Sequence, residues 1–495
     1  MIKGFPLLVG LGLWALPMSA QAVPFKLHSK AWTDVGKVMK SSDTLQTNFN
    51  RNWQQTMGLQ ISGAAELGAH LQGGFGFGLN QVYHALGNSE QEKFMLSRYI
   101  NYVSEARVTW TSDDAPNPLF SVDVGDFAFN YAPYVKNLGL YLFRGPVYPG
   151  FLVSGFKEYH TDTTRASFLG FHLHNGLGNF KQDLLFSSER DLPPSFDWSL
   201  GYIARYKALD AIEIGAGVNF YHLIAEREDI TTPSSSVPGL FGKDSNLIAS
   251  GAPYTPYQLQ YFEVLPSGET VVYTHRGTKV MGMFNIDTKR LLRLEGMLGK
   301  KDLQVYGEAA IIGTKDYGTI YAKIGDRIPY MLGVNLPAFG LLDFFSLEVE
   351  HYGAKYRADY SKLGYDRSLY FKNINAPQLS ATRGPSAIPV SRKDLAGEKW
   401  TILDNGQFYN PQTDDTVSVQ GTSIDPENMT GDDWKWSLNA EKTVLGHVQF
   451  SGQVANDHFV PRPARTTLLN ENGGLSQIFI TMKDWYWMLR VGYSF

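Results

Sequence analysis

Catalysis or metal binding would need a nucleophile, an acid–base pair or a set of metal ligands, and the histidines are the first candidates for these roles. The chain has eleven His and no Cys, which excludes thiolate catalysis, cysteine zinc sites and disulfide bonds. No G-x-S-x-G motif lies beside any of the histidines. His172 and His174 share one face of an extended segment, but two imidazoles without further ligands do not make a metal site. We therefore expect no catalytic residue, no bound metal and no cofactor.

A second polar group lies between residues 354 and 432, where Asp, Asn and Gly gather at 404–406, 410–415 and 425–427. Their oxygen atoms are ligands that hard cations prefer. However, no stretch has the twelve-residue spacing of a calcium loop, and solvated loops use the same residues in local turns. We expect a solvated loop here.

The segment 127–150 is too apolar and aromatic for a freely solvated loop. Aromatic faces beside polar donors suit sugars and other flat amphipathic solutes. Two interpretations stay open: the segment narrows an aqueous path, or it is a strand with its rings at the strand end. In the first case the residues that contact solute are Tyr131, Tyr134, Tyr141, Arg144 and Tyr148.

Much of the chain alternates apolar and polar residues with period two, which is the pattern of a strand with two different faces. In 345–350, for example, Phe, Leu and Val alternate with Ser, Glu and Glu. The polar series carries charges in the middle of its strands. These are Arg205, Glu213, Glu308, Glu348, Glu350, Lys435, Glu441 and Arg490, with Glu105, Arg107, Lys181 and Asp183 on further segments.

The last segment, 485–495, has the same alternation and ends on Phe495. Its odd positions are all apolar and its even positions are mixed. Aromatic residues gather at strand ends, as at Trp434 with Trp436 and at Trp485 with Trp487. This placement favours lipid around the apolar faces and water at the polar faces.

The first 22 residues have the features of a secretory signal peptide: Lys3, a short apolar run and a small-residue cleavage site. We expect residues 23–495 to form one exported domain. No later segment has 18 uninterrupted apolar residues, so a helical membrane protein is excluded. The net charge of −4 is mild and mixed, which argues against a nucleic-acid partner.

The signal peptide, the alternating strands and the terminal Phe are similar to those of Gram-negative outer-membrane β-barrels, porin-like proteins included, over nearly the whole exported chain. The resemblance implies a place in the outer membrane, contact with its lipid, and recognition of the C-terminal strand by the barrel-assembly machinery. No specific porin family is identified, so no selectivity residues carry over. A homo-oligomer is expected by analogy only.

We expect an all-β, transmembrane antiparallel barrel of about sixteen strands, within a range of 14 to 18, because closure with both ends on one side needs an even number. Short periplasmic turns are expected at 175–178, 207–210, 337–342 and 444–446, and long outer loops near 130–165, 225–276, 354–432 and 459–483. The predicted strands are 24–34, 56–67, 70–84, 98–110, 119–129, 166–174, 179–187, 197–206, 211–224, 277–287, 302–312, 328–336, 343–353, 433–443, 446–458 and 484–495.

Such a barrel predicts a channel for passive diffusion of small hydrophilic solutes, with saccharides as one candidate. The charges on the polar faces either select ions or pair across the interior to support the wall. Without Glu105, they comprise six carboxylates and five cations, which predicts a weak cation preference at most. The alternative function is a surface-display or adhesion barrel, in which the loops 225–276 and 354–432 bind an external partner.

Overall fold

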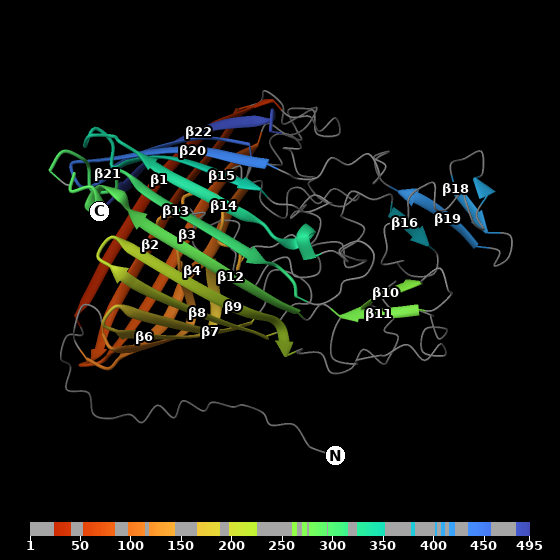
Figure 1. Ribbon diagram of the computed structural model, residues 1–495, viewed down its shortest axis with the longest axis horizontal. Helices are drawn as coiled ribbons and strands as arrows, with labels where there is room; N and C mark the ends of the chain where they lie inside the picture. The colour runs from red at the N-terminus through yellow and green to blue at the C-terminus, as the bar shows by residue number, and fades with distance from the viewer. Residues whose placement is uncertain are drawn as a thin grey trace, which may run out of the picture.

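The computed structural model shows a closed antiparallel barrel of sixteen strands, in which each strand pairs with its neighbour in the chain and β1 pairs with β22 (Figure 1). Residues described by the structure are 24–40, 53–84, 98–113, 118–143, 166–188, 198–224, 260–264, 270–274, 277–294, 296–314, 324–351, 378–381, 401–402, 407–410, 415–420, 434–456 and 482–495. The barrel strands are β1 Phe25–Lys40, β2 Trp53–Gly68, β3 Leu71–His84, β4 Arg98–Thr111, β5 Phe120–Phe129, β6 Ala166–Leu177, β7 Phe180–Ser188, β8 Trp198–Leu209, β9 Ile212–Ile224, β12 Gly277–Asp287, β13 Gln304–Ile311, β14 Tyr330–Leu336, β15 Phe344–His351, β20 Trp434–Val444, β21 Val448–Ala455 and β22 Trp485–Ser494.

The predicted fold class and strand number are confirmed, because each predicted strand overlaps one barrel strand. Individual boundaries differ from the prediction. The largest difference is at β1, which continues to Lys40 instead of ending near residue 34. This extension has a partner on both sides, since Lys37 lies opposite Trp53 of β2 and Lys40 opposite Trp485 of β22. The pairing holds residues in the sheet that the local sequence did not identify as strand.

The barrel closes where β1 pairs with β22. Backbone hydrogen bonds join Ser29 and Phe495 in both directions, at 2.8 and 2.9 Å. Further along the same pair of strands, Arg490 binds the carboxylate of Asp34 through Nε and a terminal nitrogen, at 2.5 and 2.7 Å. Both side chains are nearly buried. A planar two-bond contact of this kind fixes the register of β1 against β22.

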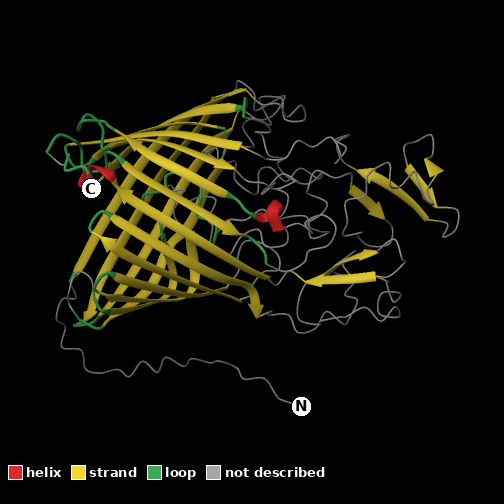
Figure 2. Ribbon diagram, viewed as in Figure 1, coloured by secondary structure: helices red, strands yellow, loops and turns green. Residues whose placement is uncertain are grey.

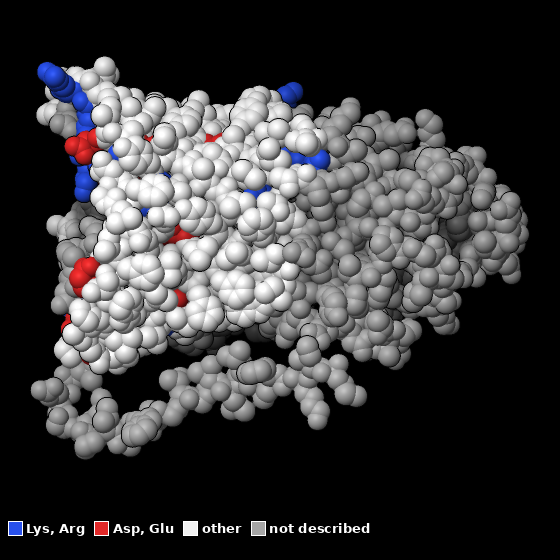
Figure 3. Space-filling model, turned by 60° about the horizontal axis from the view of Figure 1, so that its bottom comes forward, with Lys and Arg blue, Asp and Glu red and all other residues white. Residues whose placement is uncertain are grey.

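The two faces of the wall differ as the alternation predicts. In β15, Ser346, Glu348 and Glu350 are buried while the residues between them are partly exposed. The outward series is apolar and exposed, with Ile61, Phe77, Phe171, Ile214, Leu332 and Leu489 as examples from six strands. Figure 3 shows that charged side chains gather at one end of the wall and are few over the rest of its described surface. Within the described residues, no helix has the length and apolar character to cross a membrane.

Tight turns connect strands at the barrel end where the C-terminus lies (Figure 2). Leu445 and Gly446 join β20 to β21, both with positive φ, and the His447 N–H donates to the Val444 carbonyl at 3.2 Å. Two consecutive positive φ values are typical of the hairpin turns that match the right-handed strand twist. Short turns also join β6 to β7, β8 to β9 and β14 to β15.

The predicted outer loops lie mostly outside the described residues. Two small sheets are described within them, neither of which was predicted. One is β10 Gln260–Val264 with β11 Thr270–Thr274, and the other has the order β16–β19–β18–β17. The strands of the second sheet are β16 Gln378–Ala381, β17 Thr401–Ile402, β18 Gln407–Asn410 and β19 Asp415–Gln420. Both sheets lie beyond the barrel end opposite the C-terminus (Figure 1). The expected signal peptide lies outside the described residues.

Candidate functional site

After β5 the chain turns into the barrel instead of passing directly to β6. This stretch, Asn130–Phe143, is named the inner segment. Tyr131, Leu138, Tyr141 and Leu142 have no exposed surface. The segment contacts inward side chains of β8, β9, β12, β13 and β15, so it crosses from β5 to the opposite wall.

Glu348 of β15 holds the middle of the inner segment. Its carboxylate accepts hydrogen bonds from the backbone N–H groups of Lys136, Asn137 and Leu138, at 2.6, 2.8 and 3.0 Å. The hydroxyl of Tyr306 donates a further bond at 2.9 Å. Glu348 is fully buried. Burying a carboxylate is costly unless donors surround it, and here the backbone of the segment supplies most of them.

The next three residues bind two other carboxylates. Gly139 N–H donates to Glu350 at 3.0 Å, while Leu140 and Tyr141 N–H donate to Glu308 at 2.8 and 2.7 Å. Gly139 and Leu140 both have positive φ, at 81° and 60°. This conformation points successive N–H groups the same way and forms a concave anion site. Six consecutive backbone N–H groups therefore meet three glutamates of the wall.

The carbonyl side of the inner segment is held by the wall at β8 and β9. Arg205 donates to the Tyr131 carbonyl at 3.1 Å, and Asn219 donates to the Leu142 carbonyl at 3.2 Å. Leu142 also fills the space above Gly217, where an added Cβ would overlap its Cδ1 atom. Polar groups and close packing thus fix the segment on this wall as well.

An ionic network continues from Arg205 along β7, β6 and β5. Asp183 accepts from Arg205 at 2.8 Å and lies 2.9 Å from His172 Nε2 and 2.8 Å from His174 Nδ1. His172 Nδ1 lies 3.1 Å from Asp123, which also accepts from Arg107 at 3.2 Å. These charges pair along the wall, which is the supporting role that the sequence left open for Arg107, Asp183 and Arg205.

The network brings a third ligand atom to the two histidines, which the sequence analysis did not identify. Nitrogens of His172 and His174 and an oxygen of Asp183 lie within 4.8 Å of one another. The other Asp183 oxygen is bound to the Arg205 guanidinium. A metal ion here would lie next to that positive charge, so the arrangement fits an ionic network better than a metal centre.

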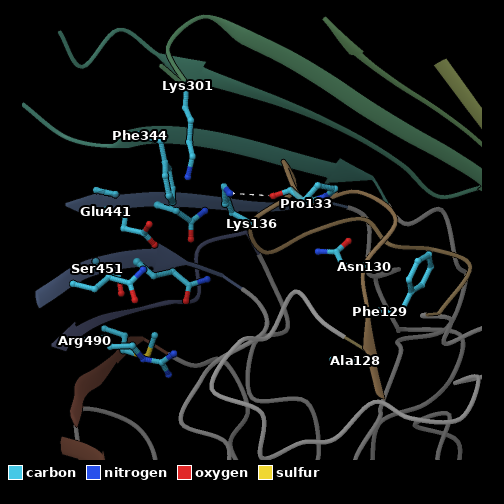
Figure 4. Close-up of a pocket in the computed structure, with 16 residues that line it drawn as sticks. Ala128, Phe129, Asn130, Pro133, Lys136, Lys301, Phe344, Glu441, Ser451 and Arg490 are labelled. Carbon is cyan, nitrogen blue, oxygen red and sulfur yellow. Dashed lines mark hydrogen bonds between the residues drawn. The ribbon is translucent and has the colours of Figure 1, made fainter. Parts of the chain in front are cut away.

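A cavity of about 550 Å³ lies on the other side of the inner segment, against β20, β21 and β22 (Figure 4). Asn130, Pro133 and Lys136 of the inner segment form one wall, and Lys301 and Phe344 lie at its edge. Strand β5 contributes Ala128 and Phe129. Strands β20, β21 and β22 contribute Asn439, Ala440, Glu441, Gln449, Ser451, Gly452, Gln453, Met488 and Arg490. Amides, one hydroxyl and a few charges give this space a mostly polar lining.

The residues predicted to line the pore fall into three groups. Glu441 and Arg490 border the cavity, whereas Glu308, Glu348 and Glu350 are buried beneath the inner segment. The other three, Arg205, Glu213 and Lys435, do not border this cavity, and Lys435 is nearly fully buried.

The described aromatic residues that were predicted to contact solute do not line the cavity. Tyr131 and Tyr141 are fully buried, with hydroxyls 2.7 Å from Glu308 and 3.0 Å from Glu350. Tyr134 contacts the sulfur of Met283 at 3.4 Å. Arg144 and Tyr148 lie outside the described residues. The rings at the cavity are those of Phe129 and Phe344.

Sequence reasoning did not identify Lys136, Lys301 and Phe344 as site residues. The ammonium nitrogens of Lys136 and Lys301 lie 4.5 and 5.1 Å from the centre of the Phe344 ring. Lys301 belongs to the turn between β12 and β13. No local pattern separates these lysines from solvated loop residues, because only the barrel brings them to one ring.

Comparisons with known proteins give structural matches only. The sequence matches no protein-family model and no curated relative. Among solved structures, the chain is similar to a mutant of the Rh. blastica porin, with 9% identity, a TM-score of 0.40, and coverage of 95% of this chain and 100% of the porin. Salmonella typhi OmpF in a complex with daunomycin gives 9% identity, a TM-score of 0.40, and coverage of 96% and 98%.

Proposed function

We propose that the protein is a porin-like channel of a bacterial outer membrane, through which small hydrophilic solutes diffuse passively. The observation that carries this proposal is the polar cavity beside the inner segment, inside a closed barrel of sixteen strands. Barrels of about sixteen strands are wide enough to leave an aqueous path through their interior.

The outer surface supports a place in a membrane. The exposed apolar residues of the wall form the lipid-facing series that such barrels need. Aromatic pairs lie at both ends of the strands, where interfacial girdles belong. Trp53 with Trp487 and Tyr330 with Trp434 lie at one end, and Trp110 with Phe120 at the other.

The inner segment is proposed to narrow the bore, because it crosses the lumen. The space that remains beside it is the cavity along β20, β21 and β22. Saccharides are proposed as one solute class. The Phe129 and Phe344 rings beside Asn439, Gln449 and Gln453 offer apolar faces next to amide groups, which is the surface that a sugar ring uses.

Planar-bilayer recording tests the channel. Purified, folded protein is expected to give stepwise conductance in KCl, and folded protein without steps would contradict the proposal. Ser451→Trp fills the cavity from β21 and is expected to lower the step size by about twofold or more. Phe450→Trp is the matched control, because Phe450 is the neighbouring residue on the outward face. Equal conductance of the two variants would mean that solute does not pass through this cavity.

The adhesion alternative is supported by the small sheets in 225–276 and 354–432, since folded structure in a loop gives a partner a defined surface. Removing both segments separates the two functions. Lost binding to cells or matrix with nearly unchanged conductance favours adhesion. Altered conductance without any binding activity favours the channel alone.

A further inference from the structure

Three carboxylates of the lumen, on β13 and β15, are withdrawn from water. Glu348 and Glu350 have no exposed surface and Glu308 is nearly buried. Their oxygens accept from the inner segment backbone at 2.6 to 3.0 Å. Lys435 of β20 lies directly opposite Glu350. Donors and a neighbouring cation therefore compensate these charges, and a passing ion meets none of their oxygens.

At the cavity, cations outnumber carboxylates. Lys136, Lys301 and Arg490 border it, against the single carboxylate of Glu441. Asp34 lies behind Arg490 and binds its guanidinium. Counting Asp34 as well still leaves three cations against two carboxylates. The net charge at the cavity is therefore positive, whereas the sequence predicts a small excess of carboxylates for the whole lumen.

The two lysines are held at this wall by Phe344. Both ammonium groups lie within cation–π distance of its ring. The Lys136 ammonium also donates to the Pro133 carbonyl at 3.2 Å (Figure 4). Charges fixed at the wall of a cavity act on ions across a Debye length of about 10 Å at 0.1 M salt, which exceeds the reach needed in a space this small.

We propose that this cavity makes the channel selective for anions, and that its favoured solutes are inorganic anions and small carboxylates. Lys136 and Lys301 attract the anion, and the side-chain amides of Asn439, Gln449 and Gln453 offer N–H donors along the path. This inference rests on the proposed channel function and deepens it by naming the solute class.

Zero-current potentials across planar bilayers with a tenfold KCl gradient test the proposal. The native protein is expected to show a higher permeability for chloride than for potassium. The double variant Lys136→Gln with Lys301→Gln is expected to lower that ratio by about twofold or more. Glu441→Gln changes one charge at the same cavity in the opposite direction and is expected to raise the ratio.

Lys26→Gln is the matched control, because Lys26 is exposed, pairs with Glu66 and does not border the cavity. It is expected to leave the ratio unchanged. If the double variant fails to fold, Lys301→Gln alone provides the test, since Lys301 lies in a turn.

The outcomes separate the two proposals. Absence of conductance in the native protein would overturn the channel function and this inference together. Conductance with a preference for potassium would overturn the inference while the channel stands. A chloride preference that all variants retain would also overturn it, because the selectivity would then arise outside this cavity.

Discussion

The hydroxyl of Tyr131 donates a 2.7 Å hydrogen bond to Glu308, a residue 177 positions away on the opposite side of the barrel. Tyr131 begins the inner segment, and Glu308 also accepts from the backbone N–H groups of Leu140 and Tyr141 near its end. One carboxylate therefore joins both parts of the segment to β13. This attachment holds the segment, which forms one wall of the cavity, against β13.

Tyr131→Phe removes a hydroxyl that donates to Glu308 and accepts from the Leu142 N–H at 3.3 Å. The ring volume is kept. We expect a loss of about 2 kcal/mol in the free energy of unfolding, since a charged acceptor loses a donor and a buried N–H loses its acceptor. Urea unfolding in detergent micelles measures it.

Tyr134→Phe is the matched control for that substitution. Within the described residues its hydroxyl donates to the sulfur of Met283, which is a weak acceptor. We expect a loss of about 0.5 kcal/mol or less. Equal losses for the two variants would mean that the Tyr131–Glu308 bond does not hold the segment.

Glu348→Ala leaves the N–H groups of Lys136, Asn137 and Leu138 without their acceptor. We expect destabilisation of about 3 kcal/mol or more. The inner segment should also be released, which predicts larger and noisier conductance steps and faster proteolysis within 130–143. Glu66→Ala is the control, because this exposed residue pairs with Lys26 at a rim and its loss should cost about 0.5 kcal/mol or less. Unchanged channel noise in Glu348→Ala would show that the carboxylate is not needed to fix the segment.

Asp34→Ala removes a carboxylate that binds Arg490 at the closure of the barrel. A nearly buried guanidinium without its carboxylate is expected to cost about 3 to 5 kcal/mol. A double-mutant cycle with Arg490→Ala measures the coupling, and the exposed Lys26–Glu66 pair gives the comparison. We expect strong coupling at the closure and about 0 to 1 kcal/mol at the exposed pair. Additive losses in the Asp34–Arg490 cycle would contradict a structural role for this pair.

Phe495→Ala keeps the backbone bonds between Phe495 and Ser29 while removing an exposed ring. If the C-terminal strand is recognised by the barrel-assembly machinery, the variant should assemble poorly in cells yet refold in detergent with nearly native stability. Assembly is measured as folded barrel in isolated outer membranes, and stability by urea unfolding. Normal assembly in cells would remove the proposed role of this ring.

The sequence by itself determined the strands and the two faces of the wall. In an extended strand, neighbouring side chains point to opposite sides, so a period of two separates lipid-facing from inward residues without knowledge of the partner strand. That is why 343–353 and 484–495 were identified from their own residues. The end of β1 was missed because its last residues are strand only through pairing with β2 and β22.

The inner segment shows where this local information ends. Its aromatic composition set 127–150 apart from solvated loops, but strand and infolded loop remained equal interpretations. Only contacts across the barrel distinguish them, because six consecutive N–H groups find their acceptors on Glu308, Glu348 and Glu350. The local sequence of each of these three strands does not distinguish its glutamate from an inward charge that meets water.

The charge balance at the cavity was likewise decided by the tertiary structure. Counting charges along the sequence treats every inward carboxylate as equal, and predicts a weak cation preference. Closure of the barrel buries three glutamates under the inner segment and brings Lys136 and Lys301 to the ring of Phe344. The sequence determined which side chains point inward, because that depends on strand geometry alone. Which of them meet water depended on residues far apart in the chain, because burial is a property of the packed barrel.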